Sequence, residues 1–250
     1  MSVQSVERAV ALLIACAPGG RSLTDLATEA DLAVSTAARL LATLCELAVV
    51  SREDDGGYGP GPVLQGLAIG MDRTGSLRAI TDPTLVDLVG VTGETCGMSI
   101  ALGDEVRYIA EVSGSNLIQV REFTNYQLPL HVVSSGLVIL AHWPAMLVDR
   151  YLQQPLAEFT VKSVVEPSMI RRRLDQIRQD GFCWTREEFA EGISSVAAPV
   201  LDASGEPVAA IHCHGPTFRF DAALDVEIQE AVVAAAAEVS AVLGVSVAAA

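Results

Sequence analysis

The chain has 250 residues, of which 50% are hydrophobic and 19% are charged. This composition is typical of a folded globular protein and excludes an intrinsically disordered one, and the length allows one large domain or two modest ones. The formal net charge of −15 argues against a strongly basic nucleic-acid binder. No stretch approaches the roughly eighteen apolar residues of a membrane span, and the N-terminus has no basic segment followed by an apolar one. We therefore expect a cytoplasmic protein that does not associate with a membrane.

Three short helical patterns occupy the first 50 residues. Apolar residues recur at helical spacing over about residues 5–17, and the sequence APGGR then ends this helix. A second helix follows, for which Ser22 or Thr24 is a suitable N-cap, and after the turn DLA a third covers about residues 34–47. A helix pair with a tight turn is typical of a helix-turn-helix, whose second helix enters the major groove of DNA.

Four side chains suit contact with DNA. Ser35 and Thr36 stand at the start of the third helix, where small hydroxyls and free amides contact phosphate oxygens. Arg39 lies four residues after Ser35 and three after Thr36, so the three share one face, and a guanidinium there can reach a guanine edge. Arg52 begins an expected hairpin and is placed for the flanking DNA backbone. The same pattern also fits a three-helix bundle with no nucleic-acid role.

The local charge weighs against tight DNA binding. Residues 1–75 hold five arginines and no lysine against nine carboxylates, which gives a net charge of −4. Glu53, Asp54 and Asp55 lie in the expected hairpin, or wing. Since phosphate neutralisation supplies much of the affinity for DNA, we expect weak, strongly salt-sensitive binding by each protomer, offset by oligomerisation.

The pattern changes after the turn-rich stretch GGYGPGP. We expect a winged helix-turn-helix at residues 1–61, a linker helix at 62–76 and a second domain at 77–250. In the second domain the patterns predict helices at about 77–91, up to 141, from 144, at 166–180 and at 221–243, and strands at 95–102, 106–112, 116–123, 182–186, 193–201 and 207–213. Strands with helices before, between and after them predict an α+β domain with an antiparallel sheet.

Several segments together resemble the IclR family of bacterial transcriptional regulators. The N-terminal ones are SVERAVALL, SLTDLATEADLAVSTAARLLATL and VVSREDDGGYGPGPVLQGLA. The later ones are LVDLVGVTGETCGMSIALGDEVRYIAEV, LPLHVVSSGLVILA and DQIRQDGFCWTREEFAEGISSVAAPVLDASGEPVAAIHCHGP. The resemblance spans nearly the whole chain, in order and with matching spacings.

The resemblance implies a winged helix-turn-helix, a linker helix and a GAF/PAS-like effector-binding domain. It also implies a homodimer or homotetramer that binds a palindromic double-stranded DNA operator under the control of a small-molecule effector. This chain departs from the family at three positions. Val34 stands where a basic residue is frequent, Ala38 where a large polar residue is frequent, and Gly59 where the wing often carries arginine.

Carried over position by position, the resemblance places the effector-binding side chains at Ser134, Ser135, Thr185, Ser195, His212 and His214. Relatives that bind glyoxylate-like anions often carry Asp, Cys and two Ser at the last four of these positions. The site in this chain is therefore also polar, but it has different side chains at these four positions. We expect a small anionic or hydroxylated organic effector.

The histidines leave three interpretations open. His212 and His214 are two residues apart on a strand, so their side chains share one face, and we expect His131 to lie near the same cavity. They can form an ordinary polar wall, recognise an anionic or hydroxylated effector, or bind a metal. The metal site needs a third ligand that the sequence does not identify. We accordingly assign no metal, no cofactor and no catalytic residue.

Two other groups of charges are interpreted as solvent-exposed. Glu187 and Glu188 are expected in a solvated loop, and the basic cluster at residues 171–173 is expected to serve solvation or subunit contacts. The sequence thus favours a repressor or activator of a metabolic operon. Two alternatives remain open, namely a small-molecule sensor that has lost DNA affinity and an enzyme that uses the histidine-lined site.

Overall fold

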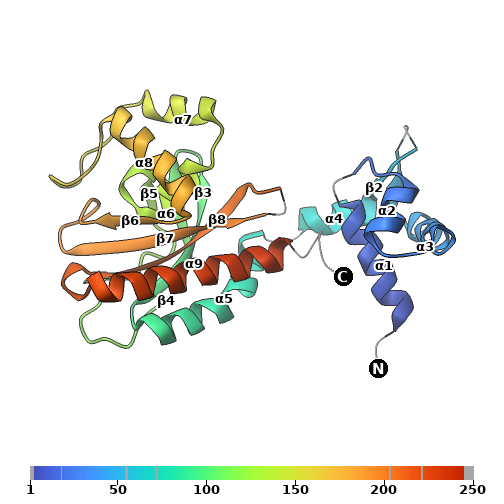
Figure 1. Cartoon of the computed structure of the whole chain (residues 1–250), viewed down its shortest axis with the longest axis horizontal. Helices are drawn as coiled ribbons and strands as arrows, with labels where there is room; N and C mark the ends of the chain where they lie inside the picture. The colour runs from blue at the N-terminus through green and yellow to red at the C-terminus, as the bar shows by residue number, and fades with distance from the viewer. Residues whose placement is uncertain are drawn as a thin grey trace. The chain divides into compact units, whose positions relative to one another are not determined.

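A computed structural model describes residues 3–17, 19–53, 56–70, 73–202, 204–220 and 222–244. Internal contacts divide the chain into two compact units, one that extends to Arg73 and one that covers Thr74–Leu243 (Figure 1). Within the described part of the chain, no helix is both long and apolar enough to cross a membrane.

In its described residues, the first unit packs three helices beside a two-stranded hairpin, and a fourth helix follows the hairpin. In chain order its elements are α1 (Gln4–Cys16), α2 (Leu23–Glu29), α3 (Val34–Glu46), β1 (Val50–Arg52), β2 (Tyr58–Pro60) and α4 (Pro62–Gly70). Leu12, Leu26 and Leu41 are fully buried where α1, α2 and α3 meet. The antiparallel hairpin β1–β2 is extended by a bridge between Arg21 and Tyr58. This is the winged helix-turn-helix that the sequence predicts.

Local chemistry sets the turn between α2 and α3. Ser22 caps α2, because its side chain accepts a hydrogen bond from the Asp25 N–H at 3.2 Å. Asp31 then adopts a positive φ of 50° and turns the chain before α3 begins at Val34. The short turn fixes α3 against the two preceding helices and leaves its opposite face to solvent.

The second unit is built on one antiparallel sheet. Its elements are α5 (Arg73–Thr92), β3 (Thr95–Leu102), β4 (Glu105–Val112), β5 (Gln127–Pro129), the 3-10 turn η1 (Leu130–Val132), α6 (Ser134–Ala141), α7 (Ala145–Leu152), α8 (Pro167–Asp180), β6 (Cys183–Arg186), β7 (Ile193–Leu201), β8 (Pro207–Pro216), η2 (Thr217–Arg219) and α9 (Ala222–Gly244). The six strands lie in the order β5-β4-β3-β8-β7-β6. Long β3, β8 and β7 therefore form the centre of the sheet.

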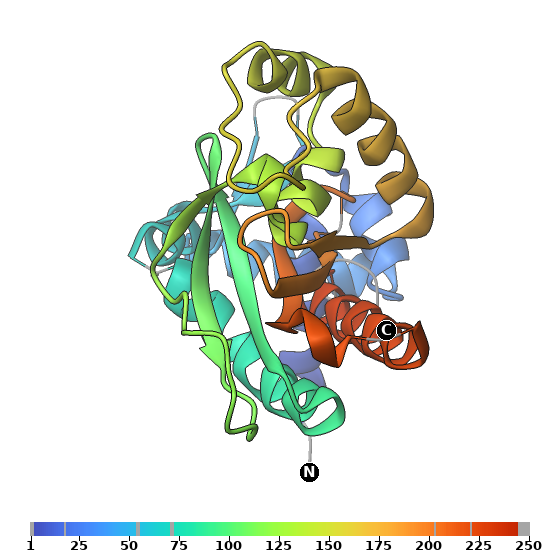
Figure 2. The same ribbon diagram turned by 90° about the vertical axis from the view of Figure 1, so that its left-hand side faces the viewer.

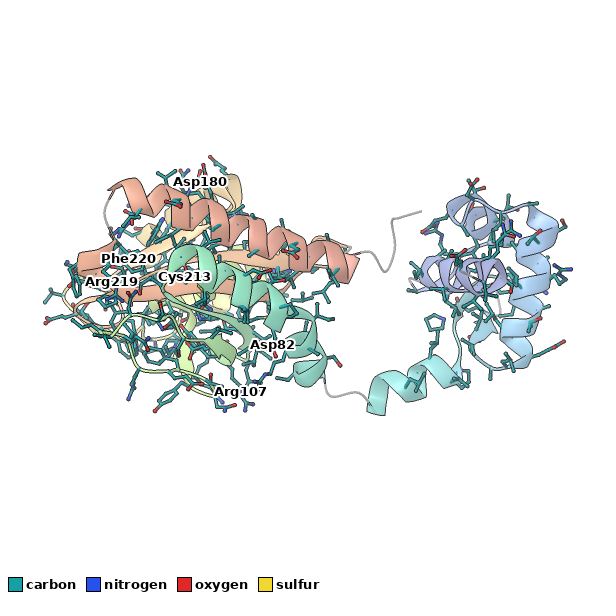
Figure 3. All side chains as sticks on the ribbon, turned by 90° about the horizontal axis from the view of Figure 1, so that it is seen from below. Asp82, Arg107, Asp180, Cys213, Arg219 and Phe220 are labelled. Atoms are coloured by element: carbon teal, nitrogen blue, oxygen red, sulfur yellow. The ribbon has the colours of Figure 1, made fainter. Side chains whose placement is uncertain are left out.

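Helices cover both faces of this sheet. On one face α6, α7 and α8 pack over Tyr108 and Ala197, and α6 is buried along its whole length (Figures 1 and 2). On the other face α5 and α9 cover Ile211 and Cys213 (Figure 3). At one end of β8, Arg219 is held by the buried carboxylate of Glu94. The polar residues predicted for the effector site lie on the α6 side.

One predicted strand is wrong. Residues 116–123 do not form a strand, and their apolar members Leu117 and Ile118 are exposed. The backbone groups at the free edge of β4 pair instead with the turn that follows, where the Asn125 N–H donates to the Tyr108 carbonyl. The turn passes through Asn125 at a φ of 70° into the short strand β5. Apolar character alone therefore misidentified an exposed loop as the third strand.

Helix boundaries also differ from prediction at the joint between the units. The predicted linker helix over residues 62–76 covers α4, residues 71–72 outside the described part, and the start of α5. The helix predicted over 77–91 begins earlier, at Arg73. By contrast, β3 occupies the predicted residues 95–102.

Candidate functional site

The exposed face of α3 carries the residues predicted to contact DNA. Ser35 and Arg39 are exposed and Thr36 is half-buried, whereas Ala37 and Leu41 on the opposite face are buried. Among the described residues the Arg39 guanidinium has no hydrogen-bond or ion-pair partner. The helix thus presents two hydroxyls and one cation to solvent at its N-terminal half.

Arg52 is held within the wing. Its side chain is exposed, lies over the Tyr58 ring at 5.8 Å from the ring centroid, and donates from Nε to the Gly56 carbonyl at 3.5 Å. These contacts orient the guanidinium along the hairpin. Of the three acidic wing residues, Asp54 and Asp55 lie outside the described residues.

The third acidic wing residue, Glu53, turns back toward the loop after α1. Its Oε1 accepts a hydrogen bond from the Gly20 N–H at 3.3 Å. A Cβ atom at Gly59 would lie only 2.4 Å from the same oxygen and 3.3 Å from the Gly19 Cα. A side chain at position 59 would therefore displace the Glu53 carboxylate from its place beside the Gly20 N–H.

A chain of hydroxyl groups joins three elements on the α6 side of the sheet. The Oγ of Ser195 on β7 lies 2.6 Å from the Oγ of Ser134 on α6 and 3.0 Å from the Oγ1 of Thr185 on β6. Thr185 and Ser195 meet because they are paired in the β6–β7 ladder. The neighbouring Ser135 Oγ is buried and has no hydrogen-bond partner among the described residues.

The two predicted histidines do share one face, and a carboxylate joins them. Glu111 on β4 and His212 on β8 flank Gly97 of β3 in the ladder, and His214 follows two residues along β8. The Oε1 of Glu111 lies 3.8 Å from the His212 Nε2 and 3.8 Å from the His214 Nδ1. Glu111 is not among the predicted site residues, because its place across β3 from His212 depends on the register of three strands.

Glycine at position 97 makes this arrangement possible. A Cβ there would lie 2.8 Å from the His212 Nε2, 2.8 Å from the Glu111 Cγ and 2.5 Å from the Ala110 carbonyl oxygen. The space above β3 is thus filled by side chains that lean in from the two neighbouring strands. A glycine inside a central strand was the one signal in the sequence for such a close approach.

Burial and charge together set the protonation of this cluster. Burial raises the pKa of Glu111, but the adjacent imidazoles of His212 and His214 and the N–H of Phe123 outweigh it, so the pKa is below its usual value. The pKa of His214 is lowered to about 4, mainly by burial and next by His212, against the opposing effect of Glu111. At neutral pH the cluster therefore combines an ionised carboxylate with a neutral His214.

The cavity beside the hydroxyl chain is small. Its volume is about 20 Å³, room for one water molecule. Three predicted effector residues, Thr185, Ser195 and His214, line it together with aromatic and aliphatic side chains from Tyr108, Phe123, Leu128, Val133, Phe189 and Ile193. Ser134, Ser135 and His212 are close in the fold but are not part of this lining.

His131 does not belong to the histidine cluster. Its Nδ1 lies 2.8 Å from the Tyr151 hydroxyl and its Nε2 lies 3.0 Å from the Ala157 carbonyl. The backbone N–H of His131 also donates to the Tyr151 hydroxyl, at 3.2 Å. The expectation that His131 lies at the same cavity was wrong, because η1 directs its ring toward α7.

The acidic residues after β6 are not simply solvated. Glu188 is buried, and its carboxylate accepts two hydrogen bonds from Arg173 of α8, at 2.6 and 2.8 Å. Arg173 also donates to the Trp184 carbonyl. One member of the basic cluster at 171–173 therefore anchors α8 to the loop after β6 through a buried ion pair.

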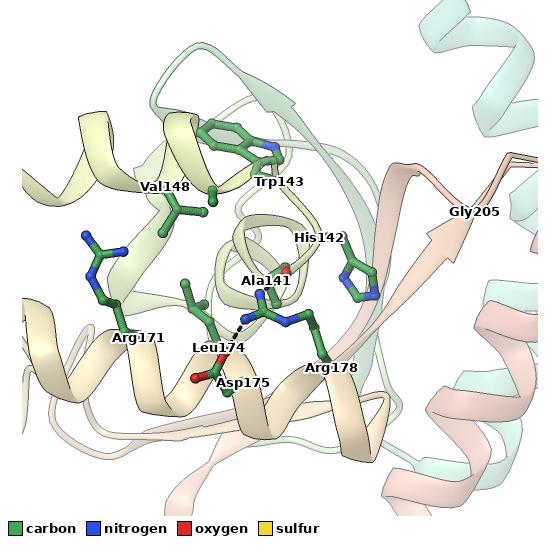
Figure 4. Close-up of a pocket in the computed structure, with 10 residues that line it drawn as sticks. Ala141, His142, Trp143, Val148, Arg171, Leu174, Asp175, Arg178 and Gly205 are labelled. Atoms are coloured by element: carbon green, nitrogen blue, oxygen red, sulfur yellow. Dashed lines mark hydrogen bonds and ion pairs between the residues drawn. The ribbon is translucent and has the colours of Figure 1, made fainter.

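A larger cavity lies elsewhere, between α6, α7 and α8. Its volume is about 480 Å³, and Trp143, His142 and Arg178 are among the residues that line it (Figure 4). The two arginines of its lining are already paired, Arg171 with Asp149 and Arg178 with Asp175. None of the predicted effector residues lines it, and its cations are not available for an anion without breaking these pairs.

Both units match models of known protein families. Residues 5–54 match the model of the IclR helix-turn-helix domain, and residues 73–241 match that of the bacterial transcriptional regulator IclR C-terminal domain. The chain is 31% identical over 243 residues to the HTH-type transcriptional regulator BhcR of Paracoccus denitrificans, covering 95% of this chain and 86% of that protein.

Two further comparisons cover almost the whole chain. The transcriptional repressor IclR of Escherichia coli is 31% identical over 250 residues, covering 97% of this chain and 90% of the repressor. The crystal structure of an IclR transcriptional regulator from Silicibacter sp. TM1040 superposes with a TM-score of 0.79 at 26% identity, covering 98% of this chain and 96% of that one. The resemblance and the α+β fold class are thereby confirmed, and the chain belongs to the IclR family of DNA-binding bacterial transcriptional regulators.

Proposed function

We propose that the chain controls transcription of a metabolic operon by binding a palindromic operator through Ser35, Thr36 and Arg39 of α3, with Arg52 on the flanking backbone. The observation that carries this proposal is the exposed guanidinium of Arg39, which has no partner among the described residues. It lies beside two hydroxyls on the second helix of the helix-turn-helix, the helix that this motif places in the major groove. The protein acts in the cytoplasm, where the operator is accessible.

The effector is a small anionic or hydroxylated organic molecule bound on the α6 side of the sheet. Ser134, Ser195 and Thr185 supply hydroxyls that can exchange their mutual hydrogen bonds for bonds to a ligand. Ser135, His212 and His214 add buried polar atoms that lack partners among the described residues. Because the cavity holds only about 20 Å³, binding requires the aromatic side chains that line it to move.

The protein works as a homodimer or homotetramer. A palindromic operator needs two DNA-binding heads related by a two-fold axis. Exposed Val3, Val6 and Val10 form an apolar stripe along α1 that a second copy can cover. In this scheme the second unit binds the effector and supports assembly, and the linker helix transmits effector binding to the relative placement of the two heads.

A gel shift on the DNA that adjoins the protein's own gene tests the assignment of α3. Arg39→Ala is expected to abolish the shift, because it removes a base contact worth roughly 1–3 kcal/mol from each head of an already weak binder. Arg8→Ala is the matched control, since it removes another exposed arginine of the same unit. An unchanged shift with Arg39→Ala contradicts the assignment.

The two alternative functions make different predictions. A sensor that has lost DNA affinity binds the effector but gives no shift with the wild-type protein at low salt. An enzyme with a histidine-lined site consumes its ligand. Measuring DNA binding and ligand turnover on the same preparation separates the three.

A further inference from the structure

The carboxylate–histidine cluster under α6 lacks the hydrogen bonds that buried polar groups normally make. The side chains of Glu111, His212 and His214 are 0%, 2% and 4% exposed. Yet Glu111 Oε1, both ring nitrogens of His212 and the Nε2 of His214 have no hydrogen-bond partner among the described residues. Buried polar atoms in this number are rare in a native protein, and two of them, Glu111 Oε1 and His212 Nε2, lie close enough to share one unseen partner.

The spacing of the three groups identifies the kind of partner. The two separations from Glu111 Oε1 are 3.8 Å, too long for hydrogen bonds, and all three candidate ligand atoms lie within 4.8 Å of one another. Ligands at about 2.1 Å from a tetrahedral ion are roughly 3.4 Å apart. The Glu111 oxygen therefore needs to approach each imidazole by only a few tenths of an ångström to share one ion. The two imidazole nitrogens, which lie within 4.8 Å of each other, need to approach by up to roughly 1.4 Å.

The surroundings hold these three side chains close to one another. The other oxygen of Glu111, Oε2, accepts a hydrogen bond from the Phe123 N–H, which fixes the carboxylate and leaves Oε1 for the cluster. The rings of His212 and His214 are stacked at 5.7 Å, and the Tyr108 ring packs edge-on against His212. The absence of a side chain at Gly97 lets Glu111 and His212 approach each other over β3.

We propose that Glu111, His212 and His214 bind one divalent transition-metal ion of the zinc class through Oε1, Nε2 and Nδ1. Two imidazoles and one carboxylate are a donor set that such ions prefer over calcium or magnesium, which take mainly oxygen ligands.

The site adjoins the proposed effector pocket, because His214 also lines the small cavity there. Three protein ligands leave at least one coordination position for a small molecule. The ligand class that fits is a carboxylate, above all one with a hydroxyl or keto group beside it, since it can chelate the ion. This extension rests on the proposed effector role of the pocket, whereas the metal site itself does not.

Zinc binding by the untagged full-length protein tests the site. After removal of metal with a chelator, titration with zinc chloride alone in a calorimeter is expected to show one strong site per chain. Glu111→Gln keeps the size of the side chain and an oxygen for the Phe123 N–H, so it preserves the fold while it removes the anionic ligand. It is expected to weaken zinc binding at least about 100-fold, as is His212→Ala.

Two controls keep the outcome interpretable. His142→Ala removes a histidine outside the cluster and is expected to leave zinc affinity unchanged. Cys45→Ser removes the one partly exposed thiol among the five cysteines, all of which the structure describes, and is also expected to have no effect. Cobalt bound in place of zinc should give visible absorption bands of nitrogen and oxygen coordination that vanish in Glu111→Gln.

The proposal is overturned if the wild-type protein takes up no zinc at one equivalent per chain. It is equally overturned if folded Glu111→Gln and His212→Ala, checked by circular dichroism, bind zinc as tightly as the wild type. Because no DNA or effector is present in this titration, its failure leaves the DNA-binding proposal standing. A failed gel shift likewise leaves the metal site standing.

Discussion

A Cβ atom at Gly97 would lie 2.8 Å from the Nε2 of His212, which faces Gly97 across the β3–β8 ladder. It would also lie 2.5 Å from the backbone carbonyl of Ala110 on β4. The backbone contact cannot be relieved by rotating a side chain. The absence of a side chain at position 97 is thus a condition for the cluster on the sheet.

Gly97→Ala is therefore expected to destabilise the second unit by about 1–3 kcal/mol, because overpacking forces β3, β4 and β8 apart. The free energy of unfolding in urea measures this directly. Gly90→Ala on α5 is the matched control. A Cβ there meets no atom of the described residues within 4 Å, so the substitution should be neutral or slightly stabilising. Equal stability of the two variants would show that the sheet tolerates the methyl group.

The buried ion pair between α8 and the loop after β6 supports a second prediction. Arg173→Met should lower the free energy of unfolding by roughly 3 kcal/mol, because it leaves the Glu188 carboxylate buried without its bidentate partner. Arg172→Met removes an exposed arginine from the same helix and should change stability by less than about 0.5 kcal/mol. If both variants unfold at the same urea concentration, the pair contributes little.

His131 should make stability depend on pH. Burial lowers the pKa of His131 below its usual value of 6.5, against smaller opposing effects of the Ala157 carbonyl and Glu188. The unfolded chain therefore binds the proton more readily, and the contribution of the neutral ring is complete above pH 6.5 and is lost as the pH falls toward the folded-state pKa. Protonation also makes Nδ1 a donor, so Nδ1 can no longer accept a hydrogen bond from the Tyr151 hydroxyl.

Urea unfolding at pH 7 and pH 5 measures this effect. His131→Gln should lose less stability than the wild type between these two pH values, although it is less stable at pH 7. His142→Gln, which changes a half-buried histidine at the end of α6, should lose as much as the wild type. An identical pH dependence in the wild type and His131→Gln would exclude His131 as a source.

The acidic wing gives a fourth prediction. Glu53→Gln should raise DNA affinity a few-fold at low salt, because it removes a negative charge from the wing while an amide oxygen can still accept the Gly20 N–H. The gain should shrink as salt is added, since exposed charges are screened. Glu46→Gln at the other end of α3 is the control. No gain with Glu53→Gln would mean that the wing does not approach DNA.

Most of the fold could be predicted because each element carries its own period. The alternation in residues 95–102 and the helical spacing in α3 are local properties, and both elements appear where expected. The strand predicted at residues 116–123 is wrong, because a loop with exposed Leu117 and Ile118 has the composition of a strand. In the folded chain, the turn at Asn125 makes the hydrogen bond to β4 that a strand at these residues would make.

The site could be predicted only in part for a related reason. That His212 and His214 share a face follows from the two-residue period of a strand. That Glu111 meets them follows from the register of three strands, and that Arg173 meets Glu188 follows from the packing of α8. Neither register nor packing is written in a local pattern, so these partners appear only in the folded chain.

The most direct test of regulation is a DNase footprint of the region upstream of the protein's own gene. The footprint is recorded with and without small carboxylates that raise the melting temperature of the protein. We predict two protected half-sites related by a two-fold axis, and a shift in the protein concentration at half-protection when such a carboxylate is added. The contradicting result is a protein that the carboxylate stabilises but that protects no DNA at low salt. This result would contradict the proposal that the chain is a working regulator.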